Sequence, residues 1–546
     1  MMKLNRIFAL MLAGASLTAM AQTHVEGEEY YKADQLENAQ ELLQRSLNNP
    51  GTDKSVSDYY LGMIALDNNK LDEAAKYFAS GVSANANNAY NYVGQGYLAL
   101  KKGDVKTAED LFKQADKLSK KDPSLQIAIA RAYDNADPAK YSKQIAKQIE
   151  KARKFDKNNV NPDIYIFEGD QLKEQKDFGG AGAKYEMATT YDPNATAAYV
   201  KYANLFTQVN PDYAITMLKK LLQINPSSAL GQRELANAYY NKSDYKNAAT
   251  EYGKYVTNPA HFRQDENRYA FLLFYGGDFK KGYDYASQLL AKDPKNFTAQ
   301  RYQFMNAAQI PDMKEQLLPL AEKLWSTHKA DPANNRFAAI DYTLIADELD
   351  KAKRVDEAVD VLKEGIKDLP ENASFNKQLA FVYVDQNDLA KASDAYKGYL
   401  EKTAEPSNND YMQQAMFSFY AGVQNQQADP AKANEYFEDA LAMSAKAAEI
   451  NPQSYSPKKM QGDVAKQRAP KDQADSAAVP YYVESLSLLE ASDNPARYAR
   501  DAKDMYMYLG NYYYTNKIDD KAKQYFNGYL KYDPENATVK KFVEGI

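Results

Sequence analysis

The sequence predicts an all-α fold made of stacked helical hairpins, and three observations support this prediction. A small residue is followed by alanine twelve positions later and by a large apolar residue four positions after that, as at Gly62, Ala74 and Phe78. The same spacing recurs along much of the chain. Polar turn sequences, such as DNNKLD at residues 67–72, separate the two halves of a copy. Self-similarity with a period of roughly 20–50 residues is typical of a repeat array.

Helix packing explains the spacing within a copy. The small and large apolar residues fall at i, i+3, i+4 and i+7, which is one face of an α-helix. The small residues let two helices approach closely, and the ring fills the space between neighbouring hairpins. Proline ends the second helix because it lacks an N–H, as at Pro193. Further copies are Gly27 with Ala39 and Leu43, Gly96 with Ala108 and Phe112, Gly169 with Ala181 and Tyr185, Ala236 with Ala248 and Tyr252, Ala346 with Ala358 and Leu362, Ala380 with Ala392 and Tyr396, Gly510 with Ala522 and Phe526, and looser copies at Ala203, Ala270 and Ala421.

The first 21 residues have the features of a secretory signal peptide. Lys3 and Arg6 precede a short apolar run, and Ala19-Met20-Ala21 is a small-x-small cleavage pattern. The alternative is a buried N-terminal helix. We therefore predict export, with a mature start near Gln22. No later stretch approaches the roughly 18 apolar residues that a membrane-spanning helix needs, so no transmembrane segment is predicted.

The remaining chain is predicted to form two repeat arrays. Residues 22–296 form an N-terminal array, and residues 297–332 form a degenerate helical repeat at the junction, which contains the only tryptophan. Residues 333–546 form a C-terminal array. An exposed insertion with two prolines, residues 463–480, interrupts this array, and a short capping helix ends it.

Composition excludes several classes of site. The chain has no cysteine, so disulfides and thiolate metal sites are excluded. His24, His261 and His328 belong to separate repeats, so neither a metal nor a cofactor site is expected, and no catalytic motif is found. The net charge of −6 disfavours nucleic acid as a partner. The acidic run EGEE at residues 26–29 is expected at a solvated helix end, which favours negative charge.

The repeated residues resemble the tetratricopeptide repeat. The family's 34-residue hairpin has a small residue at position 8, alanine at 20, an aromatic residue at 24 and proline at 32. Position 11 holds Tyr30, Tyr239, Tyr383 and Tyr513. The family's tryptophan at position 4 is replaced by Tyr165, Tyr199, Tyr342 and Tyr506. The resemblance implies a right-handed superhelical solenoid of about 14–15 units, in which the first helix of each unit lines the concave face.

The resemblance also implies a site for a protein or peptide partner. In this family, positions 2, 5, 9 and 12 of the first helix commonly meet a bound peptide. The corresponding residues here are Asn204, Arg233, Asn237 and Tyr240, with Asn511 and Tyr514 near the C-terminus. Their amide and guanidinium groups suit the backbone or a carboxylate of a partner. The alternative is an ordinary solvated helix face.

The sequence therefore predicts a non-enzymatic scaffold that holds protein partners in its groove. Export predicts the periplasm or the periplasmic face of the outer membrane, as part of outer-membrane, secretion or uptake machinery. The Tyr-, Asn- and Lys-rich composition resembles that of exported Bacteroidota proteins, and Asp475-Ser476-Ala477 resembles a glycosylation acceptor of that group. Two alternatives remain: a glycan-binding solenoid, in which tyrosines stack on sugars, and an enzyme with its site in residues 297–332.

Overall fold

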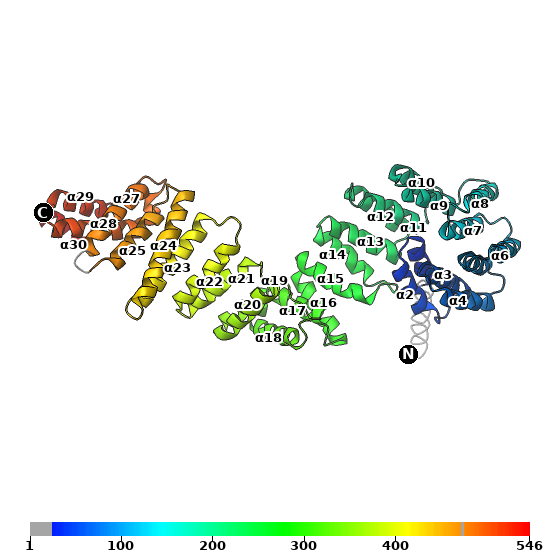
Figure 1. The fold of residues 1–546 in the computed structure, drawn as a ribbon, viewed down its shortest axis with the longest axis horizontal. Helices are drawn as coiled ribbons and strands as arrows, with labels where there is room; N and C mark the ends of the chain where they lie inside the picture. The colour runs from blue at the N-terminus through cyan, green and yellow to red at the C-terminus, as the bar shows by residue number, and fades with distance from the viewer. Residues whose placement is uncertain (1–23, 471–473, 546) are drawn as a thin grey trace, which may run out of the picture. The chain divides into compact units, whose positions relative to one another are not determined.

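The computed structural model describes residues 24–470 and 474–545, and all regular secondary structure in these residues is helical. The chain divides into two compact units, Met1–Gln309 and Ile310–Ile546 (Figure 1). Their boundary falls within the segment 297–332. The predicted signal peptide, residues 1–21, lies outside the described residues. Over the described ranges, the structure contains no helix with the length and apolar character needed to cross a membrane.

The first unit begins with a helix over residues 24–32. It continues with α2 (Leu36–Ser46), α3 (Lys54–Asp67), α4 (Leu71–Ala84), α5 (Ala89–Lys101), α6 (Val105–Leu118), α7 (Pro123–Ala136), α8 (Ser142–Phe155), α9 (Pro162–Glu174), α10 (Phe178–Tyr191), α11 (Thr196–Phe206), α12 (Pro211–Ile224), α13 (Ala229–Asn241), α14 (Tyr245–Tyr255), α15 (Arg263–Tyr275), α16 (Phe279–Lys292) and α17 (Phe297–Ala307).

The second unit begins with a 3₁₀ turn, η1 (Pro311–Met313). Its helices are α18 (Lys314–Ala330), α19 (Ala339–Lys351), α20 (Val355–Asp368), α21 (Ala373–Asp385), α22 (Leu389–Lys402), α23 (Asn408–Asn425), α24 (Pro430–Ile450), α25 (Ser456–Arg468), α26 (Ala474–Ala477), α27 (Val479–Glu490), η2 (Pro495–Tyr498), α28 (Ala499–Thr515), α29 (Asp519–Leu530) and α30 (Ala537–Gly545).

Successive helices form pairs, and neighbouring pairs stack through their first helices. In the first unit α3 contacts α5, α5 contacts α7 and α7 contacts α9; in the second, α19 contacts α21 and α23 contacts α25. Within the two units, the described residues form thirteen successive pairs, counting residues 24–32 with α2 and α25 with α27; α17 ends the first unit, α18 follows η1 in the second, and α30 follows the last pair. The predicted all-α solenoid of about 14–15 repeats is confirmed.

The repeated glycines make room for the ring of their own hairpin. A Cβ atom added at Gly62 would lie 2.4 Å from Cε1 of Phe78, and one added at Gly169 would lie 2.6 Å from Cε1 of Tyr185. Both rings are fully buried. Carbon atoms pack at roughly 3.5–4.0 Å, so no larger residue fits at these glycines while the ring keeps its place. Phe78 is shared, because Gly94 of the next hairpin packs against the same ring.

In several hairpins the turn reverses the chain with one residue of positive φ followed by a capping aspartate. Gly103 has φ of 82°, a conformation that glycine adopts without strain. The next residue, Asp104, accepts a hydrogen bond from the backbone N–H of Thr107 at 3.0 Å. This bond satisfies one of the free N–H groups at the start of α6 and fixes where the second helix begins.

The interruption in the C-terminal array is shorter than the predicted 463–480. α25 continues to Arg468, because Val464 is fully buried in a cluster with Phe437. Pro480 lies in the first turn of α27, where its missing N–H costs no helical hydrogen bond. Ser476 of the glycosylation prediction is exposed, and its modification stays a prediction.

Candidate functional site

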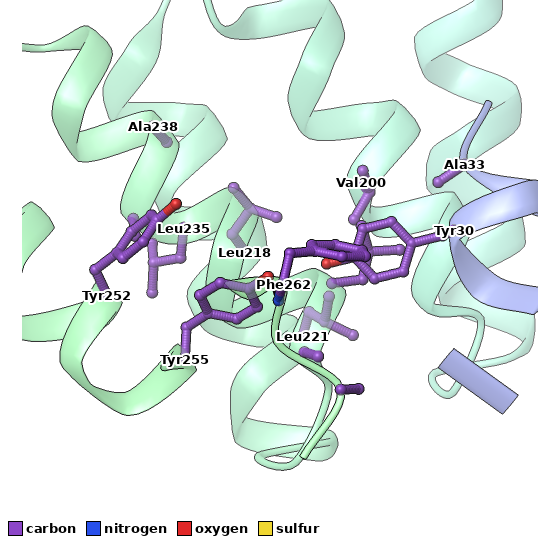
Figure 2. Packing of buried hydrophobic residues seen from close by; sticks show 14 of the residues in the cluster. Tyr30, Ala33, Val200, Leu218, Leu221, Leu235, Ala238, Tyr252, Tyr255 and Phe262 are labelled. Carbon is purple, nitrogen blue, oxygen red and sulfur yellow. Dashed lines mark hydrogen bonds between the residues drawn. The ribbon is translucent and has the colours of Figure 1, made fainter. Parts of the chain in front are cut away.

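The N-terminal hairpin, residues 24–46, packs against helices that lie far away in the sequence. Tyr30 is fully buried in one cluster with Val200 of α11, Leu230 of α13 and Phe262. The ring centroids of Tyr30 and Phe262 are 5.4 Å apart in an edge-on arrangement. Figure 2 shows Tyr30 and Phe262 facing each other within this cluster. Because the hairpin also contacts its sequence neighbour α3, the first unit closes on itself.

Two glutamates of this hairpin cap the first helices beneath it. The backbone N–H of Ala197 in α11 donates to Oε2 of Glu29 at 3.1 Å, and that of Leu230 in α13 donates to Oε2 of Glu26 at 3.1 Å. The N-cap of α11 is Ala195, which has no side-chain acceptor. Carboxylates are favourable at helix N-termini. The expectation that EGEE lies at a solvated helix end is therefore wrong for Glu26, which is only 4% exposed.

Charged groups extend this contact. Lys201 of α11 is 3% exposed; its Nζ donates to Asp34 of the hairpin and, at 2.9 Å, to Asp170 of α9. Arg131 of α7 also donates to Asp170, at 2.7 Å, and the Tyr185 hydroxyl donates to it at 2.8 Å. This chain of charges ties the hairpin to three successive first helices.

A cavity of about 640 Å³ lies between the hairpin and the first helices α3, α5, α7 and α9. The first helices α3, α5, α7, α9, α11 and α13 form one side of the first unit, which we call the inner face. The cavity volume falls in the range of roughly 300–1,000 Å³ that is usual for ligand pockets. Five tyrosines line it: Tyr31, Tyr59, Tyr60, Tyr90 and Tyr97. Ring centroids of successive tyrosines from Tyr31 through Tyr60 and Tyr59 to Tyr90 are 5.2, 5.0 and 5.5 Å apart, so four of the rings form a continuous aromatic wall.

The cavity also holds acidic groups without ion-pair partners. Asp67, Asp163 and Glu174 line it, and none of them has a lysine or arginine nitrogen within 4.0 Å among the residues described. Burial raises the pKa of Asp67 to about 6, although Lys101 opposes this effect. Rings with polar hydroxyls beside unpaired carboxylates can bind a ligand through both stacking and hydrogen bonds.

The structure places the residues predicted for partner binding in different surroundings. Arg233 of α13 donates to Asp265 at 2.7 Å and, more weakly, to Gln35 of the N-terminal hairpin at 3.4 Å, so the chain itself already occupies it. Tyr240 is half-buried beneath the guanidinium of Arg268, at 4.4 Å from the ring centroid. Asn237 is half-buried, and Asn204 is exposed on α11.

The two predicted residues of the second unit do not form a comparable site. Asn511 is exposed on α28. Tyr514 is 44% exposed, and its ring packs at 5.5 Å from that of Phe542 in the capping helix α30. In the described residues, the structure brings together Arg233, Asn237 and Tyr240 on one helix.

The inference from the repeat positions missed the cavity tyrosines. Three of them, Tyr31, Tyr59 and Tyr60, belong to the pairs Tyr30-Tyr31 and Tyr59-Tyr60. Adjacent helical residues point about 100° apart, so in the first pair one ring enters the core and the next lines the cavity. Doubled tyrosines in a first helix were thus a usable signal.

The described ranges contain no group of three or more His, Asp or Glu that could hold a metal ion. His328, in the segment considered for an enzyme, is buried and stacks on Phe337 with ring centroids 4.0 Å apart. Its Nδ1 lies 2.8 Å from the carbonyl oxygen of Asn335. These contacts assign His328 a packing role.

Glu26→Gln is expected to flatten the pH dependence of stability. Burial raises the pKa of Glu26 to about 7, although the N–H groups of Leu230 and Ala229 oppose the shift. A raised pKa stabilises the docked hairpin while the carboxyl is protonated; this contribution is complete below about pH 4.5 and is lost as the pH rises through about 7. In the parent, this group should change the free energy of unfolding by at most about 3 kcal/mol between these pH values, and the variant should lack this change. Denaturant unfolding of the full chain across the pH range measures it. Glu37→Gln, at an exposed position of α2, should keep the parental slope; equal slopes for all three proteins would contradict the prediction.

Comparisons with known proteins identify the repeat. The family model of the tetratricopeptide repeat matches residues 59–123. Similar solved structures include the C-terminal part of a TPR repeat-containing protein from Cytophaga hutchinsonii (16% identity, 51% of this chain and 99% of that one, TM-score 0.41). Others are a tetratricopeptide repeat protein from Parabacteroides merdae (14% identity, 56% and 98%, TM-score 0.30) and yeast Tom70 (15% identity, 80% and 92%, TM-score 0.28). No curated protein matches the chain.

The matched segment runs from within α3 to the start of α7 and contains the packing of a glycine against the ring sixteen residues later, at Gly62 and Gly96. The same packing recurs at Gly169 in the first unit and at Gly510 in the second. Residues 59–123 are therefore similar to tetratricopeptide repeats, as the spacing of the sequence predicted.

Proposed function

We propose that the protein is a non-enzymatic scaffold that holds a segment of a protein partner in the tyrosine-lined cavity of the first unit. The cavity carries this proposal: it is the place where the inner face combines a wall of rings with the unpaired Asp67 and Asp163. Tyrosine is enriched among residues that dominate binding energy, because it offers a large ring and a polar tip at low entropic cost.

We further propose that the scaffold works in the periplasm or at the periplasmic face of the outer membrane. The pattern of Lys3, Arg6 and Ala19-Met20-Ala21 supports export, and the absence of cysteine is compatible with an oxidising compartment. Within this proposal, the partner belongs to outer-membrane, secretion or uptake machinery.

Crosslinking from the cavity tests the partner. A photoreactive phenylalanine at Tyr60 should crosslink one main protein in the native cell, whereas the same group at Tyr191, which is exposed at the end of α10, should not. Once that protein is purified, Tyr60→Ala in the scaffold should weaken binding about 30-fold, since a buried tyrosine in an interface centre contributes about 2 kcal/mol. Tyr191→Ala should leave the affinity unchanged. Equal crosslinking from both positions, or unchanged affinity of the Tyr60 variant, would remove the cavity from the binding site.

A glycan is the second candidate ligand, because the rings of Tyr31, Tyr60 and Tyr90 would also stack on sugar rings. Titration of cell-wall fragments and polysaccharides into the purified protein, followed by calorimetry, separates the two ligand classes. Saturable glycan binding that Tyr60→Ala abolishes would favour the solenoid as a sugar-binding protein.

A further inference from the structure

We infer that the N-terminal hairpin is a displaceable internal ligand, and that the part of the inner face beneath it is a docking surface for an acidic helix of a partner. This surface consists of the N-termini of α11 and α13 with Lys201, Arg233 and Phe262. It is separate from the cavity and does not depend on the cavity being a binding site.

The hairpin shows which helix the surface fits. Glu26, Glu29 and Tyr30 stand at i, i+3 and i+4 of the helix over residues 24–32, which places them on one face, and Asp34 follows in the turn after this helix with φ of 64°. The two glutamates accept hydrogen bonds from the first turns of α13 and α11, the ring enters the apolar centre, and Asp34 binds Lys201. A partner helix with carboxylates three residues apart, followed by a ring, matches these features.

The two cations of the surface have partners outside the hairpin. Lys201 retains Asp170 at 2.9 Å, and Arg233 retains Asp265 at 2.7 Å. α13 has its own cap, since the Ser228 hydroxyl accepts from the N–H of Gly231 at 3.0 Å. Undocking therefore leaves neither cation without a partner. It frees the N–H groups of Ala197 and Leu230 and breaks the bonds from Gln35 to Glu234 and from Arg45 to the carbonyl of His261. An interface whose charges are satisfied in both states can exchange one acidic helix for another at low cost.

The hairpin itself carries features that favour release. Glu26 is buried between the hairpin and the docking surface, where an ionised carboxylate is costly. The connection to α3 contains Pro50 and Gly51, and Gly51 has φ of 87°, so the chain can change direction there. Release also changes the cavity, because Tyr31, Lys32 and Asp34 of this segment form part of its wall. Under the proposed function, a partner on the docking surface would thus regulate access to the cavity.

The test uses the full chain and exploits its lack of cysteine. Nitroxide labels at Glu37→Cys on α2 and Asn241→Cys at the end of α13, both exposed, report the distance between hairpin and surface by pulsed EPR. The parent should give one short distance. Glu26→Lys with Glu29→Lys should add a longer distance, and amide hydrogen exchange at Ala197 should rise, while far-UV circular dichroism shows that the repeats stay folded. Gln35→Ala, which removes the contacts to Arg233 and Glu234 and the bond from Asn38, is the milder variant if the first does not fold.

A synthetic peptide of residues 24–46 is the probe for the surface. It should bind the Glu26→Lys, Glu29→Lys chain at least tenfold more tightly than the parent, in which the tethered copy competes. A control peptide with glutamine at positions 26 and 29 should bind at least tenfold more weakly than the acidic one. Equal affinity of the acidic peptide for both chains, or no binding to a chain whose labels show release, would overturn the inference. A chain with one label can give a distance only to a label on another chain. A distance measured with singly labelled parent chains would therefore show that a second copy occupies the surface, and it would overturn the proposal of a partner helix. None of these readouts involves the cavity, so the proposed function can fail independently.

Discussion

Phe78→Ala is expected to lower the free energy of unfolding of the first unit by about 3–5 kcal/mol, the range observed when a buried ring is removed. The ring is fully buried and packs against both Gly62 of its own hairpin and Gly94 of the next. Two helix pairs therefore lose a shared contact, and neither backbone can fill the space without leaving its other neighbours. Denaturant unfolding of the full chain, followed by far-UV circular dichroism, measures the loss.

Gly94→Ala gives the complementary result. A Cβ atom at position 94 would lie 2.2 Å from Cε1 of Phe78, and the ring is also packed against Gly62. We expect a cost of about 1–3 kcal/mol, which should shrink or change sign in the Phe78→Ala background, where the methyl group enters empty space. Gly182→Ala is the control, because its Cβ would meet Tyr202 at an ordinary 3.5 Å and should be neutral or stabilising by up to about 1 kcal/mol. An equal cost of Gly94→Ala in both backgrounds would contradict the shared-ring packing.

Lys201→Met should destabilise the first unit by about 3–5 kcal/mol, because removing one partner of a buried ion pair leaves the other charge poorly compensated. Lys201 is the buried cation between Asp34 and Asp170. The matched control is Lys151→Met, which breaks the pair with Asp116; these side chains are 32% and 35% exposed, and the cost should stay below about 1 kcal/mol. Similar losses in the two variants would show that burial does not strengthen the Lys201 contacts.

The loss of stability at low pH provides a second test of the contacts between Lys201 and Asp170. Burial alone would raise the pKa of Asp170, but Arg131 and Lys201 outweigh it and hold the pKa below its usual value. A lowered pKa gives stability that is present above about pH 4 and is lost as the pH falls further. Lys201→Met should therefore show a shallower loss of stability on acidification than the parent. The same loss of stability at low pH in the variant and the parent would indicate that Arg131 alone lowers the pKa of Asp170.

The repeated pattern predicted the helix pairs because its spacing encodes local packing. Gly62 and Phe78 are close in sequence and in space, so the chain around them carries the information for the contact. The tyrosines at position 11 behave similarly: Tyr30, Tyr239 and Tyr513 are all buried. The exposed insertion was predicted too long, because Val464 joins a core cluster that its polar neighbours do not reveal.

The candidate site could not be predicted in full because it depends on how the first unit closes. Glu26 and Leu230 are 204 residues apart, and no local pattern relates them. The repeat positions that commonly meet a bound peptide correctly placed Arg233 on the inner face. Its side chain, however, contacts Asp265 and Gln35 of the same chain. Long-range closure depends on the summed small rotations between repeats, which single residues do not encode.

The contact between Glu26 and α13 also has a consequence for the order in which the protein is made. The N-terminal hairpin is synthesised early, yet the amide that Glu26 binds belongs to a residue added 204 positions later. At roughly 5–20 residues per second, about 10–40 s separate the two events on the ribosome. During that interval the tyrosines and carboxylates of the hairpin cannot form their contacts with α11 and α13. The segment nearest the start of the chain is thus among the last parts of the first unit to reach its mature position.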